Sequence, residues 1–154
     1  MNVRRVRTSP ETGLERANDH DVDCEAFTRA RARENANTAL LVIPGDPPSL
    51  NDAMRGRLRH RIRDKKQWQA WTYAAWLEAG RPTFKRPEVR VRCYFATVRK
   101  RDAENYAMKP LIDALTRAGA WEDDNADVYL QHRAELHIDP AAPRVELEIR
   151  ERDA

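Results

Sequence analysis

Four stretches of the chain have the hydrophobic pattern of β-strands. The apolar run at 39–43 is followed by Pro44 and Gly45, which is typical of a short buried strand and the turn that ends it. Residues 88–97 alternate between apolar and polar side chains, so they predict a strand with one buried face. The same alternation covers 128–138 and 145–149, and Pro140 and Pro143 lie between these two stretches. We therefore predict that the last two strands form a hairpin.

Two other stretches follow the spacing of helices. Residues 65–79 place Trp68, Trp71 and Ala75 on one stripe, and Gly80 follows as a stop signal. We expect these tryptophans to lie in the core or in a subunit interface, and stacking on nucleic-acid bases is the alternative. A second helix extends from about 105 to 118, or begins later, near Pro110. Its buried face consists of Met108, Leu111, Ile112 and Leu115.

The order of these elements predicts the class of fold. It reads strand, helix, strand, helix, strand, strand, which indicates an α+β fold with a mixed β-sheet covered by two main helices. The chain has 154 residues, so one domain at 39–152 is long enough to bury a core. Residues 1–38 mix both signs of charge and contain few large apolar side chains. We predict that they form a disordered or loosely docked N-terminal extension.

Positive charge is concentrated in one short stretch. The net charge is only +3, but residues 55–66 carry seven cations against one acid. The arginines alternate with Leu58, His60 and Ile62, as in a strand or an ordered loop. An arginine-rich segment of this kind binds phosphates, although a solvated surface is the alternative. The predicted DNA-binding residues are Arg55, Arg57, Arg59, Arg61, Arg63, Lys65 and Lys66, together with Arg99, Lys100 and Arg101.

Several other classes of protein are not supported by the sequence. No P-loop and no G-x-G-x-x-G motif is present, so a nucleotide cofactor is not expected. Cys24 and Cys93 stand in no metal-binding or disulfide pattern. No apolar run reaches the length of about 18 residues that a membrane span needs, and no secretory signal is recognisable. We expect a cytoplasmic protein that does not enter membranes.

Two groups of acids flank the second predicted helix. Asp102 and Glu104 are two residues apart, so on extended backbone they point to the same side, about 6.6 Å apart along the chain. Glu122, Asp123 and Asp124 follow the end of the helix. Carboxylate oxygens are the ligands that Mg²⁺ prefers, which makes these residues candidate metal ligands.

The chain must turn back for the two acid groups to meet. A helix from 105 to 118 spans roughly 20 Å, and the residues that follow can return over about the same distance. A later helix start near Pro110, or a carboxylate from a partner subunit, would make this easier. The structural alternative is that Asp102 or Asn105 caps a helix, that Glu104 interacts with its dipole, and that Asp123 and Asp124 form a surface turn.

The same residues resemble the RusA family of Holliday junction resolvases. Its core pattern reads R-D-x-D-N-x-x-K-P-x-x-D-A-L, followed by A-G-x-W-x-D-D, and a P-P-S-x-N segment precedes it. The similarity covers about residues 40–150. The matching residues are Pro47, Pro48, Ser49, Asn51, Arg101, Asp102, Asn105, Lys109, Pro110, Asp113, Ala114, Leu115, Ala118, Gly119, Trp121, Asp123 and Asp124.

The resemblance implies a function and a set of site residues. The implied function is that of a homodimeric endodeoxyribonuclease that resolves four-way DNA junctions with Mg²⁺, or with Mn²⁺ in its place. The implied catalytic residues are Asp102, Glu104, Asp124 and Lys109. The implied metal ligands are Asp102, Glu104 and Asp124, with Asp123 as a further ligand. Two departures stand out, because Glu104 replaces the second aspartate and one extra residue precedes Lys109. On a helix one residue is a rotation of about 100°, which would turn Lys109 away unless a bulge or a late helix start absorbs the extra residue. A branched-DNA-binding protein with impaired catalysis is therefore the alternative function, and a nuclease for other flapped or replicated structures is a further one.

Overall fold

One face of a five-stranded sheet is covered by helices, and the computed structural model describes this arrangement for residues 38–153, with side chains except at 52 and 53. The predicted N-terminal extension at 1–38 lies outside the described residues, apart from Thr38. The strands are β1 (Thr38–Pro44), β2 (Pro87–Phe95), β3 (Leu130–Gln131), β4 (Glu135–Ile138) and β5 (Arg144–Glu151). The helices are α2 (Leu50–Arg55), α3 (Leu58–Glu78), the short 3₁₀ helix η1 (Ala103–Tyr106) and α4 (Lys109–Ala118).

The sheet is mixed, as predicted. β5 lies between β1 and β2 and is antiparallel to both, whereas β3 and β4 pair in parallel with the other edge of β2. The alternation of buried and partly exposed residues along β1, β2 and β5 sends every second side chain to one face. In one cross-strand row, Leu41 lies opposite Leu147 and Leu147 opposite Val91, and all three are buried.

The predicted terminal hairpin is wrong. β4 and β5 do not pair with each other in the described sheet, because β2 lies between them. The long strand expected at 128–138 is also divided into β3 and β4. The alternation at 128–138 agrees with the extended backbone of β3 and β4, but Leu130 and Ile138 of its apolar positions are exposed. Period-two patterning also does not identify the neighbouring strand.

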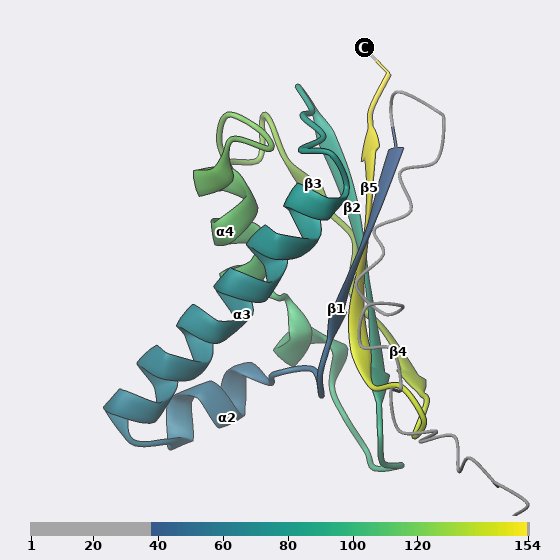
Figure 1. The fold of residues 1–154 in the computed structure, drawn as a ribbon. Coiled ribbons are helices and arrows are strands. Elements are labelled where there is room, and N and C mark those ends of the chain that lie inside the picture. Colours follow the sequence, from purple (N-terminus) through teal and green to yellow (C-terminus); the bar gives the residue numbers. More distant parts are fainter. Residues whose placement is uncertain (1–37, 154) are drawn as a thin grey trace, which may run out of the picture.

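Helices α3 and α4 pack on the apolar face of the sheet, on the left of the view in Figure 1. Trp68 and Trp76 of α3 are buried, so the prediction of tryptophans in the core holds for both, and Trp71 is 37% exposed. Helix α4 buries Leu111, Ile112 and Leu115, and Gly119 ends it with a left-handed φ of 85°. Both features of α4 agree with the sequence pattern.

The N-terminal part of α3 and the whole of α2 extend away from the sheet (Figure 1). We call residues 50–66 the arm. Every described side chain of the arm is exposed except that of Arg61, which is half-buried. The prediction of a strand or loop over 55–66 is wrong, because this stretch is helical on both sides of a break at Gly56 and Arg57. No helix among the described residues has the length and apolar character to cross a membrane.

Truncation of the central strand should destabilise the fold strongly. Leu147 is fully buried between β1 and β2, so Leu147→Ala leaves a cavity and should lower the free energy of unfolding by about 3 kcal/mol. Urea denaturation followed by tryptophan fluorescence measures this change. Val98→Ala is the control, since Val98 is 84% exposed and should change stability by less than about 0.5 kcal/mol. Equal losses in the two variants would contradict the described core.

Candidate functional site

The backbone between β2 and α4 places the first acids and Lys109. Asp102 is the N-cap of η1, and Tyr106 anchors η1 by packing edge-to-face on Phe95, with ring centroids 5.0 Å apart. Met108 then takes a left-handed conformation with φ of 54°, and α4 begins at Lys109 with Pro110 in its first turn. The late helix start that the sequence allowed is therefore present.

Lys109 connects the two halves of the sequence motif. Its Nζ donates to Asp113 Oδ1 at 2.8 Å and to Asp124 Oδ2 at 2.6 Å. The Nζ of Lys65, from the arm, lies 3.9 Å from Asp113 Oδ2. We call Lys65, Asp113, Lys109 and Asp124 the charge network. It brings together residues from α3, from α4 and from the loop that follows α4.

The charges of the network change the acidity of its members. The hydrogen bond from Lys109 is the main cause that lowers the pKa of Asp124. The pKa of Lys109 is raised, first by its hydrogen bond to Asp113 and then by the bond to Asp124. Both groups are therefore charged at neutral pH. Because the Lys109 side chain is exposed, these ion pairs contribute little to stability, and their main effect is on geometry.

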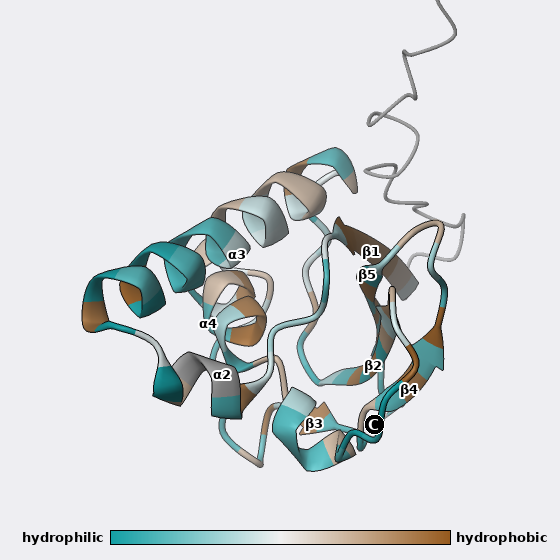
Figure 2. Ribbon diagram, turned by 90° about the horizontal axis from the view of Figure 1, so that it is seen from below, coloured by the Kyte–Doolittle hydropathy of each residue, from teal (hydrophilic) through white to brown (hydrophobic). Residues whose placement is uncertain are grey.

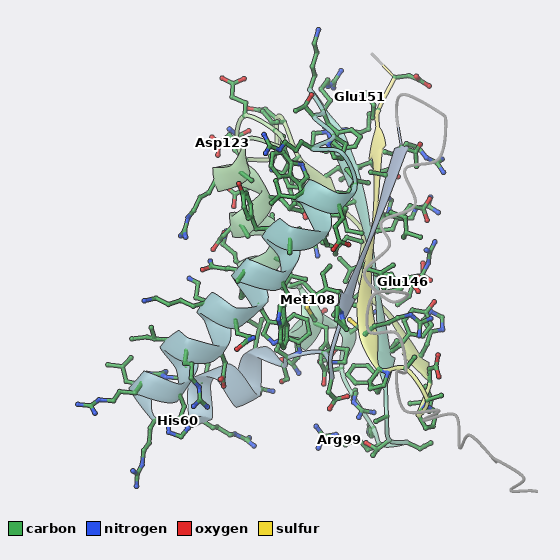
Figure 3. The ribbon with its side chains drawn as sticks, in the orientation of Figure 1. His60, Arg99, Met108, Asp123, Glu146 and Glu151 are labelled. Atoms are coloured by element: carbon green, nitrogen blue, oxygen red, sulfur yellow. The ribbon has the colours of Figure 1, made fainter. Side chains whose placement is uncertain are left out.

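The second acid group lies in a turn after α4, and Asp123 is labelled beside the end of this helix in Figure 3. Asp123 accepts hydrogen bonds from the backbone of Asp124 at 2.7 Å and from Asn125 Nδ2 at 2.7 Å. Trp121 fixes the start of the turn, since its Nε1 donates to Thr116 Oγ1 at 2.8 Å. The surface-turn interpretation of Asp123 and Asp124 is therefore correct as a local description. It does not exclude a functional role, because Asp124 also contacts Lys109.

Asp102 and Glu104 have different surroundings. Asp102 Oδ1 accepts a hydrogen bond from the backbone of Glu104 at 3.1 Å, and Arg133 lies 3.8 Å from the same oxygen. Asp102 thus caps η1, as the structural alternative proposed. Both carboxylates are exposed.

The arrangement of the acids does not fit the predicted metal site. Within residues 38–153, no three His, Cys, Asp or Glu side chains converge closely enough to hold a metal ion. Asp124 instead shares the ammonium of Lys109 with Asp113. Arg99, three residues before Asp102, lies toward the opposite end of the molecule from Asp123 (Figure 3). The described structure therefore gives no ligand geometry for Mg²⁺ or Mn²⁺ at Asp102, Glu104, Asp123 and Asp124.

The predicted phosphate-binding cations are distributed over two helical faces. Residues spaced by two diverge on a helix, whereas Arg59, Arg63 and Lys66 share one face through their spacing of four and three. Arg61 and Lys65 lie on the neighbouring face, toward α4. Arg55 ends α2 and Arg57 is the N-cap of α3. The arm is thus a helical cationic surface, and His60 marks it in Figure 3.

The cations before Asp102 are not equivalent. Arg101 donates to the backbone oxygen of Thr97 at 2.9 Å, and its guanidinium lies 3.8 Å from the centroid of the Phe95 ring. Arg101 therefore braces its own loop. Arg99 and Lys100 have exposed side chains that remain candidates for phosphate contact.

Two residues of this region were not assigned a role from the sequence. Asp113 belongs to the quoted motif, and its spacing of four from Lys109 on a predicted helix is a signal for an ion pair. Arg133, which approaches Asp102, has no comparable signal. Its position depends on how the chain around β3 and β4 aligns with β2.

Comparison with known proteins adds no assignment. No family model matches the chain, and no curated protein matches it. The resemblance to the RusA family therefore rests on the sequence motif alone.

Removal of the Lys109 charge should raise the pKa of Asp124. In Lys109→Met the hydrogen bond that lowers this pKa is lost, so the pKa should return toward its usual range. Carboxyl carbon shifts followed by NMR during a pH titration measure the change. Arg117→Gln is the control, because Arg117 is an exposed cation in the last turn of the same helix.

The same substitution has a defined pH dependence. A carboxyl with a lowered folded-state pKa stabilises the fold above its unfolded-state pKa, and this contribution is lost as the pH falls through the folded-state value. The parent should therefore be more stable than Lys109→Met at neutral pH, and the difference should vanish in acid. A pKa of Asp124 that stays unchanged in Lys109→Met would contradict the charge network.

Proposed function

We propose that the protein is a structure-selective endodeoxyribonuclease that resolves four-way DNA junctions, in the manner of the RusA family. The observation that carries the proposal is the contact between Lys109 and Asp124. These motif residues are 15 positions apart, yet Lys109 reaches Asp124 in spite of the additional residue before it. The fold supports the proposal through an α+β architecture with a mixed sheet, which is the class that the resemblance implies.

The arm supplies the second argument. Its cations form a helical surface that borders the charge network, because Lys65 contacts Asp113. A surface of this kind binds the phosphate backbone, and binding becomes weaker as salt increases. Phosphates held by the arm would lie close to Lys109 and Asp124. The proposed role of the arm is therefore phosphate binding. Phosphate binding by Arg99 and Lys100 is proposed from their exposed charges, and participation in hydrolysis by Asp102, Glu104, Lys109 and Asp124 is proposed from the resemblance.

A homodimer is part of the proposal. A four-way junction has two-fold symmetry, and its resolution requires two matched nicks. A dimer with a two-fold axis provides two identical sites in matching orientation. Mg²⁺, or Mn²⁺ in its place, remains the proposed cofactor through the resemblance. The proposal assigns no ligand geometry to the ion, since the acids do not converge in the described residues.

The separation of the acids in the described residues favours a second function. Asp102 caps η1, and Asp124 is paired with Lys109. A protein of this fold that binds branched DNA without cutting it would show the same features. The replacement of the expected aspartate by Glu104 also agrees with this alternative.

Junction cleavage by site variants distinguishes the two functions. In the presence of Mg²⁺ the parent should place paired symmetric nicks in a four-way junction and leave a matched linear duplex intact, and EDTA should prevent the nicks. Asp102→Asn and Asp124→Asn should abolish nicking, and junction binding should stay intact or become tighter because negative charge near DNA is removed. End-labelled strands on a denaturing gel provide the measurement.

Asp127→Asn is the matched control for this experiment, because Asp127 is an exposed acid near Asp124 but outside the motif. It should cut at the parent rate. If Asp102→Asn also cuts at the parent rate, the assignment of the site is wrong. Tight junction binding with no nicks under any metal would establish the non-catalytic alternative.

Loss of arm cations should weaken the binding of DNA junctions without changing the preference among DNA sequences. Arg59→Gln and Arg63→Gln each remove one phosphate contact, so each should reduce the slope of log affinity against log salt by about 1. Fluorescence anisotropy with a labelled junction at several salt concentrations measures the slope. Arg117→Gln removes an exposed cation outside the arm and should leave the slope unchanged. Equal slopes in all variants would exclude the arm from DNA binding.

A further inference from the structure

A cavity of about 520 Å³ lies where the arm meets the start of α4. Pro48, Leu58, Ile62, Trp68 and Pro110 form its apolar lining. Its size falls within the range of small-molecule binding sites, which is about 300–1,000 Å³. Pro110 follows Lys109, so the cavity borders the charge network.

The apolar walls of this cavity are exposed to solvent. Leu58 is 62% exposed and Ile62 is 47% exposed, and both come from the part of α3 that extends away from the sheet. Figure 2 shows hydrophobic segments at this end of α3 among hydrophilic ones. Clustered apolar side chains at a polar surface are typical of a binding site.

The rim of the cavity is cationic. Arg61 and Lys65 contribute to it, with Asp64 as the single acid among the lining residues. The Nε of Arg61 is shielded from solvent and has no hydrogen-bond partner among the described residues. A shielded N–H group without an acceptor costs free energy, so a ligand that brings an acceptor would be favoured. An apolar floor with a cationic rim therefore fits a ligand that is flat and apolar in one part and anionic in another.

A second copy of the chain is a poor occupant of this cavity. Two-fold association through the arm would place the same cationic surfaces against each other, and like charges across an interface are unfavourable. A nucleic acid carries the opposite charge. Its bases also have apolar faces that stack on aromatic and apolar side chains whatever their sequence.

We propose that this cavity binds an unpaired nucleobase of branched DNA. The base packs on the exposed side chains of Leu58 and Ile62, and the adjacent phosphates contact Arg61 and Lys65. This inference rests on the DNA binding in the proposed function and adds the structural feature that is recognised, because an unpaired base leaves the stack at a lower cost than a base in a linear duplex. Lys65 also contacts Asp113, so a captured base places the neighbouring phosphate beside the charge network.

The test compares two DNA probes that differ by one base. One is a duplex with a single unpaired thymine, and the other carries an abasic analogue at the same position, with all phosphates retained. The parent should bind the thymine probe roughly tenfold more tightly than the abasic probe. Fluorescence anisotropy at fixed salt provides both affinities.

The double variant Leu58→Ala/Ile62→Ala should bind both probes equally, at the affinity of the parent for the abasic probe. Both side chains are exposed, so the fold should be kept, and circular dichroism checks this. Met54→Ala is the matched control, because Met54 is 75% exposed on α2 and does not line the cavity. It should retain the tenfold difference.

The outcomes separate this proposal from the proposed function. A parent that binds both probes equally, or a double variant that retains the tenfold difference, overturns the base-binding cavity even if junctions are nicked. A tenfold difference that disappears only in the double variant establishes the cavity even if no junction is nicked. In that case only the nuclease function fails.

Discussion

The burial of one face of the sheet beneath α3 and α4 is the constraint on which the other features depend. β5 contributes its inward residues between those of β1 and β2, so three strands share a single apolar surface. Helix α4 can lie on this surface in one rotation only, because Leu111, Ile112 and Leu115 must face inward. That rotation directs Lys109 and Asp113 to the outside, where they meet Lys65 and Asp124.

The charge network is therefore positioned by the core and not by its own ion pairs. Exposed pairs contribute too little to hold a helix in place. The left-handed residue Met108 is itself buried, so the backbone turn that precedes α4 is fixed by packing. Asp102 lies before this turn, and the path of the chain keeps Asp102 and Glu104 out of a three-acid group with Asp124.

Much of the fold can be predicted from the sequence, because β1, β2, β5 and α4 carry apolar runs or apolar faces that they bury in the core. The pairing of β4 and β5 could not be predicted, since their sequences are compatible with pairing to each other or to β2. For the cationic stretch, arginines at every second position favour a strand, and only the spacing of four between Leu58 and Ile62 indicates the helix that is present. For the site, the ion pair between Asp113 and Lys109 can be predicted from their spacing of four residues on a helix. The separation of Asp102 and Glu104 from Asp124 has no such signal in the sequence, because it depends on single backbone conformations such as that of Met108.

The separation of the arm from the sheet has a consequence for how this molecule can change over evolutionary time. Since the described side chains of the arm are exposed apart from Arg61, replacing them disturbs little of the packing that keeps the chain folded. Variation can accumulate there without being purged through loss of folding, whereas the strand positions beneath α3 and α4 have no such freedom. Descendants of a common ancestor should therefore diverge first in residues 50–66. The same region is a natural place to engineer altered recognition on an unchanged scaffold.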